Sequence, residues 1–160
     1  QTWVKDITDL PDLLDYNIRN GRTYMYFQGK PLYAFGHGLS YTSFTYNSIN
    51  TNKENLEKDK TLKVSVSVSN TGKVDGAEAV QVYTSQPKAS VARPAKELKA
   101  FSKVYLKAGE TKTVELEIKA KDMAYFDENL KDWKLEKGEF VLSNAASSAQ
   151  VKSNVKIRID

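Results

Sequence analysis

The residue most suited to acid–base chemistry occurs once in this sequence, as His37 between Gly36 and Gly38. A hydrolytic triad needs such a base beside a nucleophile, with a third group to orient it. No partner of either kind is recognisable around His37. We therefore interpret His37 as a structural side chain that donates to a backbone carbonyl, and we predict no catalytic role for it.

The sequence predicts no metal site and no cofactor. A zinc site takes three or four nitrogen or sulfur ligands, and one histidine with no cysteine cannot supply them. The densest acidic patch, residues 127–129 with Asp122 and Asp132 nearby, lacks the spacing of a calcium-binding EF-hand loop. We interpret it as a solvated turn, with a calcium loop as the alternative. The Gly36-His37-Gly38 stretch is too short for a phosphate-binding fingerprint.

Carboxylate pairs are the remaining route to catalysis. Hydrolysis of a glycosidic bond needs two carboxyl groups at a fixed separation, one of them held near neutral pH. The chain has 20 acidic residues, and most alternate with lysines on the outward side of expected strands. We find no acid in a setting apolar enough to raise its pKa, so the sequence predicts no glycosidase pair.

Three aromatic residues on the expected outward side of strands could bind sugar, because ring faces pack against sugar C–H groups. They are Tyr83, Phe101 and Tyr105. The alternative is structural, with the rings packed beneath loops or against a neighbouring domain. We favour the structural alternative, because rings of this size are usually buried.

Composition limits the class of protein and of partner. The 160 residues are 40% hydrophobic and 28% charged, which is typical of a globular protein of one domain plus an attached segment. The net charge of +4 comes from lysines interspersed with acids, so we expect no nucleic-acid partner. No apolar run approaches the roughly 20 residues of a membrane span, so we expect no membrane partner. The chain begins Gln1-Thr2-Trp3, which suggests a processed or excised piece.

The first forty residues read differently from the rest. Residues 1–20 have incomplete helical spacing broken by Pro11, which predicts an extended segment with one helical turn that needs a surface to lie on. Residues 22–27 read as a short aromatic strand. Residues 31–44 then place two glycines among several rings, which predicts a buried corner. The rings of this corner and just before it are Phe27, Tyr33, Phe35, Tyr41 and Phe44.

From residue 41 the apolar pattern has a period of two, most clearly in residues 62–69, where Leu62, Val64, Val66 and Val68 alternate with polar residues. Between these strands we expect a loop over 48–59 and a helical turn over 121–130 that carries Tyr125 and Phe126. The strands are expected at 41–49, 62–69, 77–85, 97–106, 111–119, 133–135, 139–143 and 151–159, with 133–135 and 139–143 joined across residues 137–138. About seven strands with regular turns predict an all-β, immunoglobulin-like sandwich, and the lack of cysteine favours the fibronectin type III-like variant.

Several motifs in this order resemble the C-terminal region of glycoside hydrolase family 3, the β-glucosidases and β-xylosidases. They are residues 21–27, residues 31–42, Asn70-Thr71-Gly72, residues 79–83, residues 93–101, residues 106–112 and residues 133–140. The resemblance covers nearly the whole chain. One departure is Ala34, where many members of the family have proline.

The resemblance implies a parent enzyme with a barrel domain, an α/β domain and a fibronectin type III-like domain. Residues 1–40 would be the last segment of the α/β domain, and residues 41–160 the fibronectin type III-like domain. The family's catalytic aspartate and glutamate lie in the other two domains. The nucleophile motif Ser-Asp-Trp is absent here, since Asp132-Trp133 follows Lys131. The chain alone is therefore expected to be inactive.

The implied function is to stabilise catalytic domains that hydrolyse terminal β-D-glucosyl or β-D-xylosyl residues with retention. The alternative is a carbohydrate-binding module that anchors the enzyme to polysaccharide. The resemblance also suggests a homodimer formed through the parent and a periplasmic or secreted location, although this chain by itself specifies neither. The residues expected to pack between domains are Tyr24, Tyr26, Phe27, Tyr33, Phe35, His37 and Tyr41.

Overall fold

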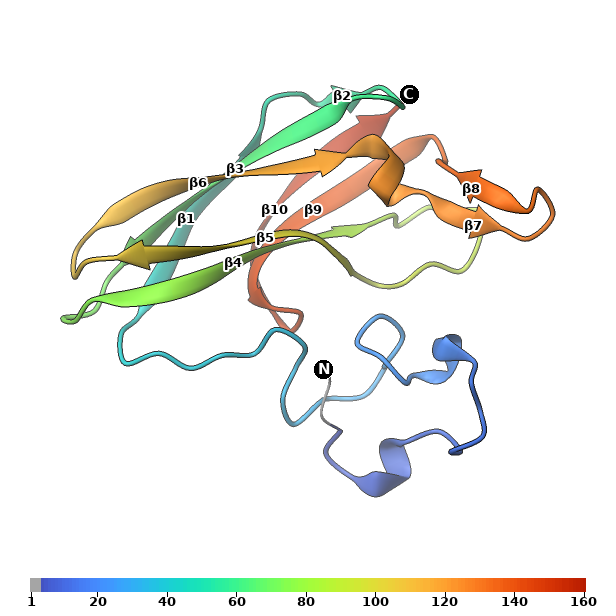
Figure 1. The fold of residues 1–160 in the computed structure, drawn as a ribbon, viewed down its shortest axis with the longest axis horizontal. Helices are drawn as coiled ribbons and strands as arrows, with labels where there is room; N and C mark the ends of the chain where they lie inside the picture. Colours follow the sequence, from blue (N-terminus) through green and yellow to red (C-terminus); the bar gives the residue numbers. More distant parts are fainter. Residues whose placement is uncertain (1–3) are drawn as a thin grey trace.

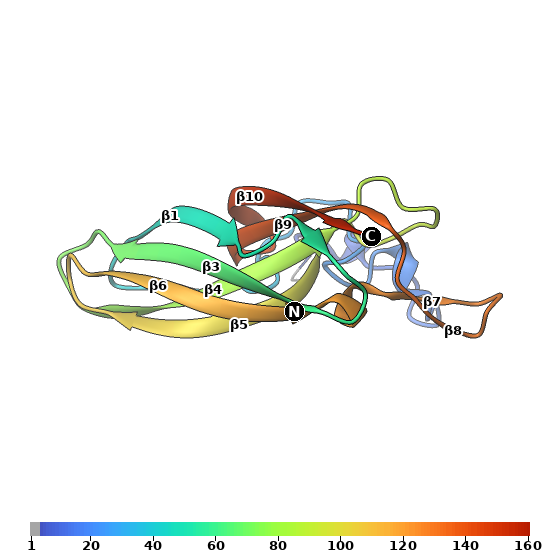
Figure 2. The same cartoon turned by 90° about the horizontal axis from the view of Figure 1, so that it is seen from above.

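The computed structural model describes residues 4–160, and residues 1–3, part of the expected 1–40 segment, lie outside the described residues. Two sheets pack face to face, as Figures 1 and 2 show from two directions. The smaller sheet has the order β1-β3-β6, and the larger has the order β2-β10-β9-β4-β5. A separate hairpin, β7-β8, extends past the end of the sandwich. The predicted all-β sandwich is confirmed.

Within residues 4–160, seven strands of eight to ten residues form most of the two sheets, and three shorter strands accompany them. The long strands are β1 (Phe44–Thr51), β3 (Thr61–Asn70), β4 (Gly76–Ser85), β5 (Glu97–Leu106), β6 (Thr111–Lys119), β9 (Gly138–Ser147) and β10 (Gln150–Ile159). The short strands are β2 (Asn55–Leu56), β7 (Tyr125–Asp127) and β8 (Asp132–Lys134). Three 3-10 turns are η1 (Ile7–Asp9), η2 (Ile18–Asn20) and η3 (Ala120–Met123).

The core forms where the alternating apolar residues of the two sheets meet. On β3, Val64 and Val66 pair with Leu116 and Val114 of β6, and these side chains face the larger sheet. Period-two alternation places every second side chain on the same face, so burying one phase fixes the register. From the larger sheet the core receives Val80, Val82, Phe140, Leu142, Ile157 and Ile159.

Four local expectations are wrong. Residues 22–27 form turns in place of a strand, and the amides of Tyr26 and Phe27 both donate to the Thr23 carbonyl, at 3.1 and 2.9 Å. The first long strand begins at Phe44, three residues late, and continues to Thr51. The expected loop over 48–59 therefore holds the end of β1 as well as β2.

The other two corrections concern the hairpin and the last strand. The helical turn η3 ends at Met123, so Phe126 lies on β7, and Trp133 pairs with it across the hairpin rather than joining β9. In β10, register shifts on both sides of Val151 turn that side chain out of the inward phase. Extra residues at such bulges are invisible to a pattern of strict alternation.

Candidate interdomain surface

An aromatic stack ties the N-terminal segment to the larger sheet. The rings of Tyr24 and Phe35 are stacked, with centroids 4.2 Å apart and planes at 10°. Tyr24 also meets Tyr83 of β4 edge-on at 6.1 Å, a favoured arrangement for aromatic rings. Tyr83 is completely buried. The N-terminal segment covers this ring on the outer face of β4, which is the structural alternative that the sequence favoured over sugar binding.

Gln81 is the polar centre of this contact. Its amide Nε2 donates to the carbonyls of Gly36 at 3.1 Å and Ala146 at 2.9 Å. Its Oε1 accepts from the Tyr83 hydroxyl at 2.6 Å. When both the nitrogen and the oxygen of a buried side-chain amide are hydrogen-bonded, the amide favours one arrangement of its neighbours as well as stabilising the fold. A partner that moved away would lose its hydrogen bond and would not gain one to water.

Gly36 has to be glycine at this contact. Its φ is +78°, and a Cβ placed on it would lie 2.1 Å from Gln81 Oε1. A side chain at position 36 would be strained by the backbone and would also displace the amide. The glycine predicted to form a corner is therefore the point where the N-terminal segment touches the sheet.

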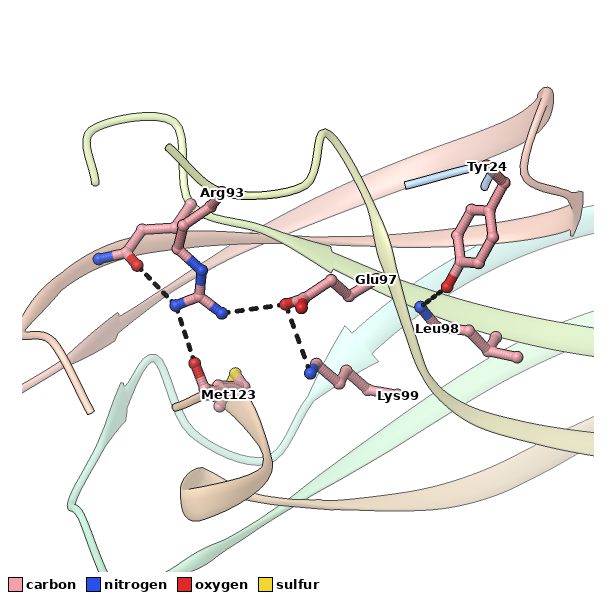
Figure 3. Close-up of polar contacts among 7 residues, drawn as sticks. Tyr24, Arg93, Glu97, Leu98, Lys99 and Met123 are labelled. Atoms are coloured by element: carbon pink, nitrogen blue, oxygen red, sulfur yellow. Dashed lines mark hydrogen bonds and ion pairs between the residues drawn. The ribbon is translucent and has the colours of Figure 1, made fainter. Parts of the chain in front are cut away.

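Three backbone groups complete the attachment of residues 21–37. The amide of Ser148 donates to the Phe35 carbonyl at 2.9 Å, and that of Ala95 to the Met25 carbonyl at 3.2 Å. The amide of Leu98, on edge strand β5, donates to the Tyr24 hydroxyl at 2.9 Å, as Figure 3 shows. Residues 21–37 are therefore an integral layer of the sandwich.

The Asn70-Thr71-Gly72 motif anchors the end of the corner. The buried Asn70 amide donates to the carbonyls of Val74 and Leu106, at 2.8 and 3.2 Å. Its Oδ1 accepts from the Thr42 hydroxyl at 2.6 Å and from the Gly72 amide at 3.1 Å. A Cβ at Gly72 would lie 2.1 Å from Thr42 Oγ1, so the turn and the corner fit only with glycine there.

A buried guanidinium joins three segments where β4 ends and β5 begins (Figure 3). Arg93 donates to Gln86 Oε1 at 3.0 Å, to the Met123 carbonyl at 2.9 Å and to Glu97 Oε2 at 2.9 Å. It also lies 5.7 Å from the centre of the Tyr125 ring. Several donors in one planar group suit this role, because a single side chain can satisfy the loop, η3 and β5 together.

A cleft of about 710 Å³ opens beside Arg93. Three segments line it: residues 18–26, residues 91–97 and the β7-β8 hairpin with its approach. At the hairpin the Phe126 and Trp133 rings meet edge-on at 6.0 Å. Sequence reasoning missed the cleft, because it joins residues more than a hundred positions apart and no local pattern marks it.

The acidic patch beside this cleft is a turn. Asp127 Oδ1 accepts from the amides of Asn129 and Leu130, at 3.0 and 3.2 Å, and Oδ2 lies 3.5 Å from Lys134 Nζ. These hydrogen bonds hold the pKa of the Asp127 carboxyl below its usual range. Over residues 4–160, no three His, Cys, Asp or Glu side chains gather in a way that could hold a metal ion. The described part also has no helix long and apolar enough to cross a membrane.

One carboxyl does occupy a desolvating environment, contrary to expectation. Glu78 Oε1 accepts from the Tyr46 hydroxyl at 2.8 Å, and burial raises the pKa of Glu78 above its usual range. Burial also raises the pKa of Tyr46, with the nearby carboxylate acting in the same direction. The partner of Glu78 is thus a phenol that links the two sheets, an arrangement suited to structure rather than to glycoside hydrolysis.

The seven residues expected to pack between domains fall into two groups. Tyr24 and Phe35 stack within the chain, and Tyr26 and Phe27 are half-buried. Tyr33, His37 and Tyr41 are exposed, with the Tyr33 and His37 rings 5.3 Å apart. The structure thus brings the first group onto the sandwich and leaves the second on the surface.

Comparison with known proteins fits this architecture. The family model for the fibronectin type III-like domain matches residues 78–148. These residues run from the third residue of β4 to just past the end of β9, across the core described above. Residues 78–148 belong to the fibronectin type III-like family.

The relatives of this fibronectin type III-like chain are much larger enzymes. It is 42% identical over 140 residues to thermostable β-glucosidase B of Acetivibrio thermocellus, covering 86% of this chain and 18% of the relative. It is 38% identical over 167 residues to an exo-α-(1→6)-L-arabinopyranosidase of Bifidobacterium longum, covering 97% of this chain and 22% of the relative. The chain therefore spans about a fifth of the length of these curated relatives.

A solved structure extends the likeness to three dimensions. The family 3 β-glucosidase of Bifidobacterium adolescentis matches all of this chain at a TM-score of 0.86 and 32% identity, with 25% of the enzyme covered. The resemblance to the C-terminal region of family 3 β-glucosidases is thereby confirmed.

Proposed function

We propose that this chain is the non-catalytic C-terminal part of a family 3 β-glycosidase and that it braces the enzyme's catalytic domains. Residues 41–160 would be the fibronectin type III-like domain, and residues 1–40 the final segment of the α/β domain before it. The parent would hydrolyse terminal β-D-glucosyl or β-D-xylosyl residues with retention. One relative is named as an arabinopyranosidase, so the sugar could differ within the family.

The observation that carries this proposal is an exposed row of large apolar side chains on residues 7–16. Ile7, Leu13, Leu14 and Tyr16 are each 77–83% exposed. The residues that follow are fastened to the sandwich by the Tyr24–Phe35 stack. Several large apolar side chains left exposed within ten residues indicate an interaction site. A larger body of the same polypeptide, as in the relatives, would cover the row.

The test uses the full-length parent enzyme and this chain in parallel. Leu13→Asp and Tyr16→Asp should lower the melting temperature of the parent, because each would bury a charge at the interface. The same changes should leave the isolated chain unaffected, where both side chains face water. Val74→Asp, an exposed apolar site on the β3-β4 turn, is the matched control. The purified chain should not hydrolyse an aryl β-glucoside.

Unchanged melting of both parent variants would refute the bracing role. Turnover of the aryl glucoside by residues 1–160 alone would refute the non-catalytic assignment. These two failures are independent of each other, so each part of the proposal is tested separately.

A second function has some support from the edge strand β5. Phe101 and Tyr105 lie four residues apart on its outward phase, and both rings are exposed. Two such rings could anchor polysaccharide, without the buried Tyr83. Affinity electrophoresis on xylan, cellulose and β-glucan tests this, and unretarded migration in all three gels would remove the idea.

A further inference from the structure

The β7-β8 hairpin presents two large rings to solvent. Phe126 is 50% exposed and Trp133 is 68% exposed, and they face each other across the hairpin in an edge-on pair. The hairpin extends past the sandwich in both views, away from the core (Figures 1 and 2). Burial of large aromatic side chains stabilises a protein, so two rings left exposed on a hairpin indicate a surface that another protein surface covers.

The base of the hairpin is firmly held. Arg93, whose side chain is almost fully buried, binds the Met123 carbonyl just before β7 and lies close to the Tyr125 ring. At the tip, Asp127 accepts two backbone amides and pairs with Lys134 across the hairpin. A surface fixed in advance binds without a large ordering cost.

Apolar side chains from segments distant in sequence line much of the cleft beside the hairpin, and Arg19, Glu128 and Asn129 are among the polar residues there. Ile18, Met25 and Val91 line it together with the hairpin rings. Ile18 also continues the exposed apolar row of residues 7–16. Ile18 therefore belongs to the cleft lining and lies two residues after the exposed row in the sequence.

We propose that the cleft and the Phe126–Trp133 pair form a second docking surface for the catalytic body of the parent enzyme. The proposal rests on the proposed function. It is supported by the two exposed hairpin rings that line the cleft and by the roughly four fifths of each curated relative that lie outside the matched region. The occupant is a protein surface of mainly apolar side chains, contributed by that body.

A saccharide is the less suitable occupant, because two of the three lining carboxylates are already engaged within the chain, which leaves Glu128 as the third. Glu97 binds Arg93 and Lys99, and Asp127 binds its own turn. A polyhydroxyl ligand needs polar groups that converge on it and are free to bond, whereas an apolar protein face needs only the rings and aliphatic side chains.

Hydrogen exchange measured by mass spectrometry on the parent enzyme and on this chain tests the proposal. Amides of residues 125–134 should exchange at least about tenfold more slowly in the parent than in the isolated chain, since docking suppresses local opening. Trp133→Ala should abolish this difference and lower the melting temperature of the parent. Phe101→Ala removes an equally exposed ring outside the cleft and should change neither quantity.

The outcomes separate this proposal from the proposed function. If residues 4–20 are protected in the parent while 125–134 exchange equally fast in both proteins, the hairpin surface is refuted and the bracing role stands. If neither segment is protected, both fail. If millimolar cellopentaose protects 125–134 in the isolated chain but the parent context does not, the cleft is a saccharide site and the docking proposal is overturned.

Discussion

Replacing Gly36 with alanine should test the attachment of the N-terminal segment more sharply than any other single change. The added Cβ would lie 2.1 Å from Gln81 Oε1 and 2.9 Å from Gln81 Cδ, so the Gln81 side chain has to move. Gly38 is the matched control, because a Cβ there meets nothing within 4 Å. The two glycines lie two positions apart in the sequence, and only a Cβ at position 36 would meet the Gln81 side chain.

The expected cost of Gly36→Ala is the sum of three terms. Holding alanine at φ +78° costs about 1–2 kcal/mol. Moving Gln81 breaks its bonds to the Gly36 carbonyl and the Tyr83 hydroxyl, at about 1 kcal/mol each. The free energy of unfolding should therefore fall by about 3–4 kcal/mol. Detachment of residues 21–37, which would expose Tyr83, would give a loss of similar size. Gly38→Ala should change it by less than about 0.5 kcal/mol.

Urea unfolding of the 160-residue chain, followed by circular dichroism, measures both variants. Gln81→Ala removes the obstructing amide, so in the double mutant Gly36→Ala should cost less than it does alone, with a coupling of about 1 kcal/mol or more. Equal stabilities of the Gly36 and Gly38 variants would refute the reasoning. Strict additivity with Gln81→Ala would show that the clash is not with that side chain.

Four further predictions concern the anchors of the fold. Asn70→Ala should destabilise by about 2–4 kcal/mol in urea unfolding, because it leaves buried partners unpaired, whereas the exposed Asn47→Ala should change little. Arg93→Lys should cost about 2 kcal/mol, since a lysine cannot reach Gln86, Met123 and Glu97 together; the exposed Arg158→Lys is its control. The pKa of the Glu78 carboxyl is higher in the folded chain than in the unfolded chain, so with rising pH the unfolded chain loses this proton first. The free energy of unfolding should therefore fall as pH rises above about 4.5. Glu78→Gln should flatten that fall in unfolding curves measured between acidic and neutral pH. Deleting residues 1–20 should leave the unfolding midpoint nearly unchanged, whereas deleting 1–40 should lower it by uncovering Gln81 and Tyr83.

The sandwich was predictable because its signal is local. Strands such as β3 bury one phase and expose the other, and that alternation is written directly in the residues Leu62 to Val68. The β4 strand shows the limit of this reasoning. Its outward residues Gln81 and Tyr83 are buried nearly as deeply as Val80 and Val82, because the N-terminal segment, far upstream in sequence, covers them.

The candidate surface was only partly predictable for the same reason. The corner glycines and rings of residues 31–44 could be found from composition, but their partner Gln81 has no local mark. Arg93 stood within a recognised motif, yet its role depends on Met123 and Glu97 being brought together by the fold. The exposed Trp133 and the buried Tyr83 are equally aromatic in sequence, and only tertiary packing separates them.

In this chain the boundary of the sandwich defined by its strands differs from the boundary defined by its packing contacts. Strand β1 begins at Phe44, so the secondary structure of the sandwich starts close to the proposed boundary at residue 40. The hydrogen bonds and stacked rings begin about twenty residues earlier, where Tyr24, Phe35 and Gly36 close over β4. Residues 21–37 therefore move with the sandwich, and the exposed apolar row of 7–16 lies outside it. If a parent body docks on this row, η2 and the turns after it would connect that body covalently to the sandwich. The Tyr24–Phe35 stack and its contact with Tyr83 would then hold the sandwich end of this connection in place on β4.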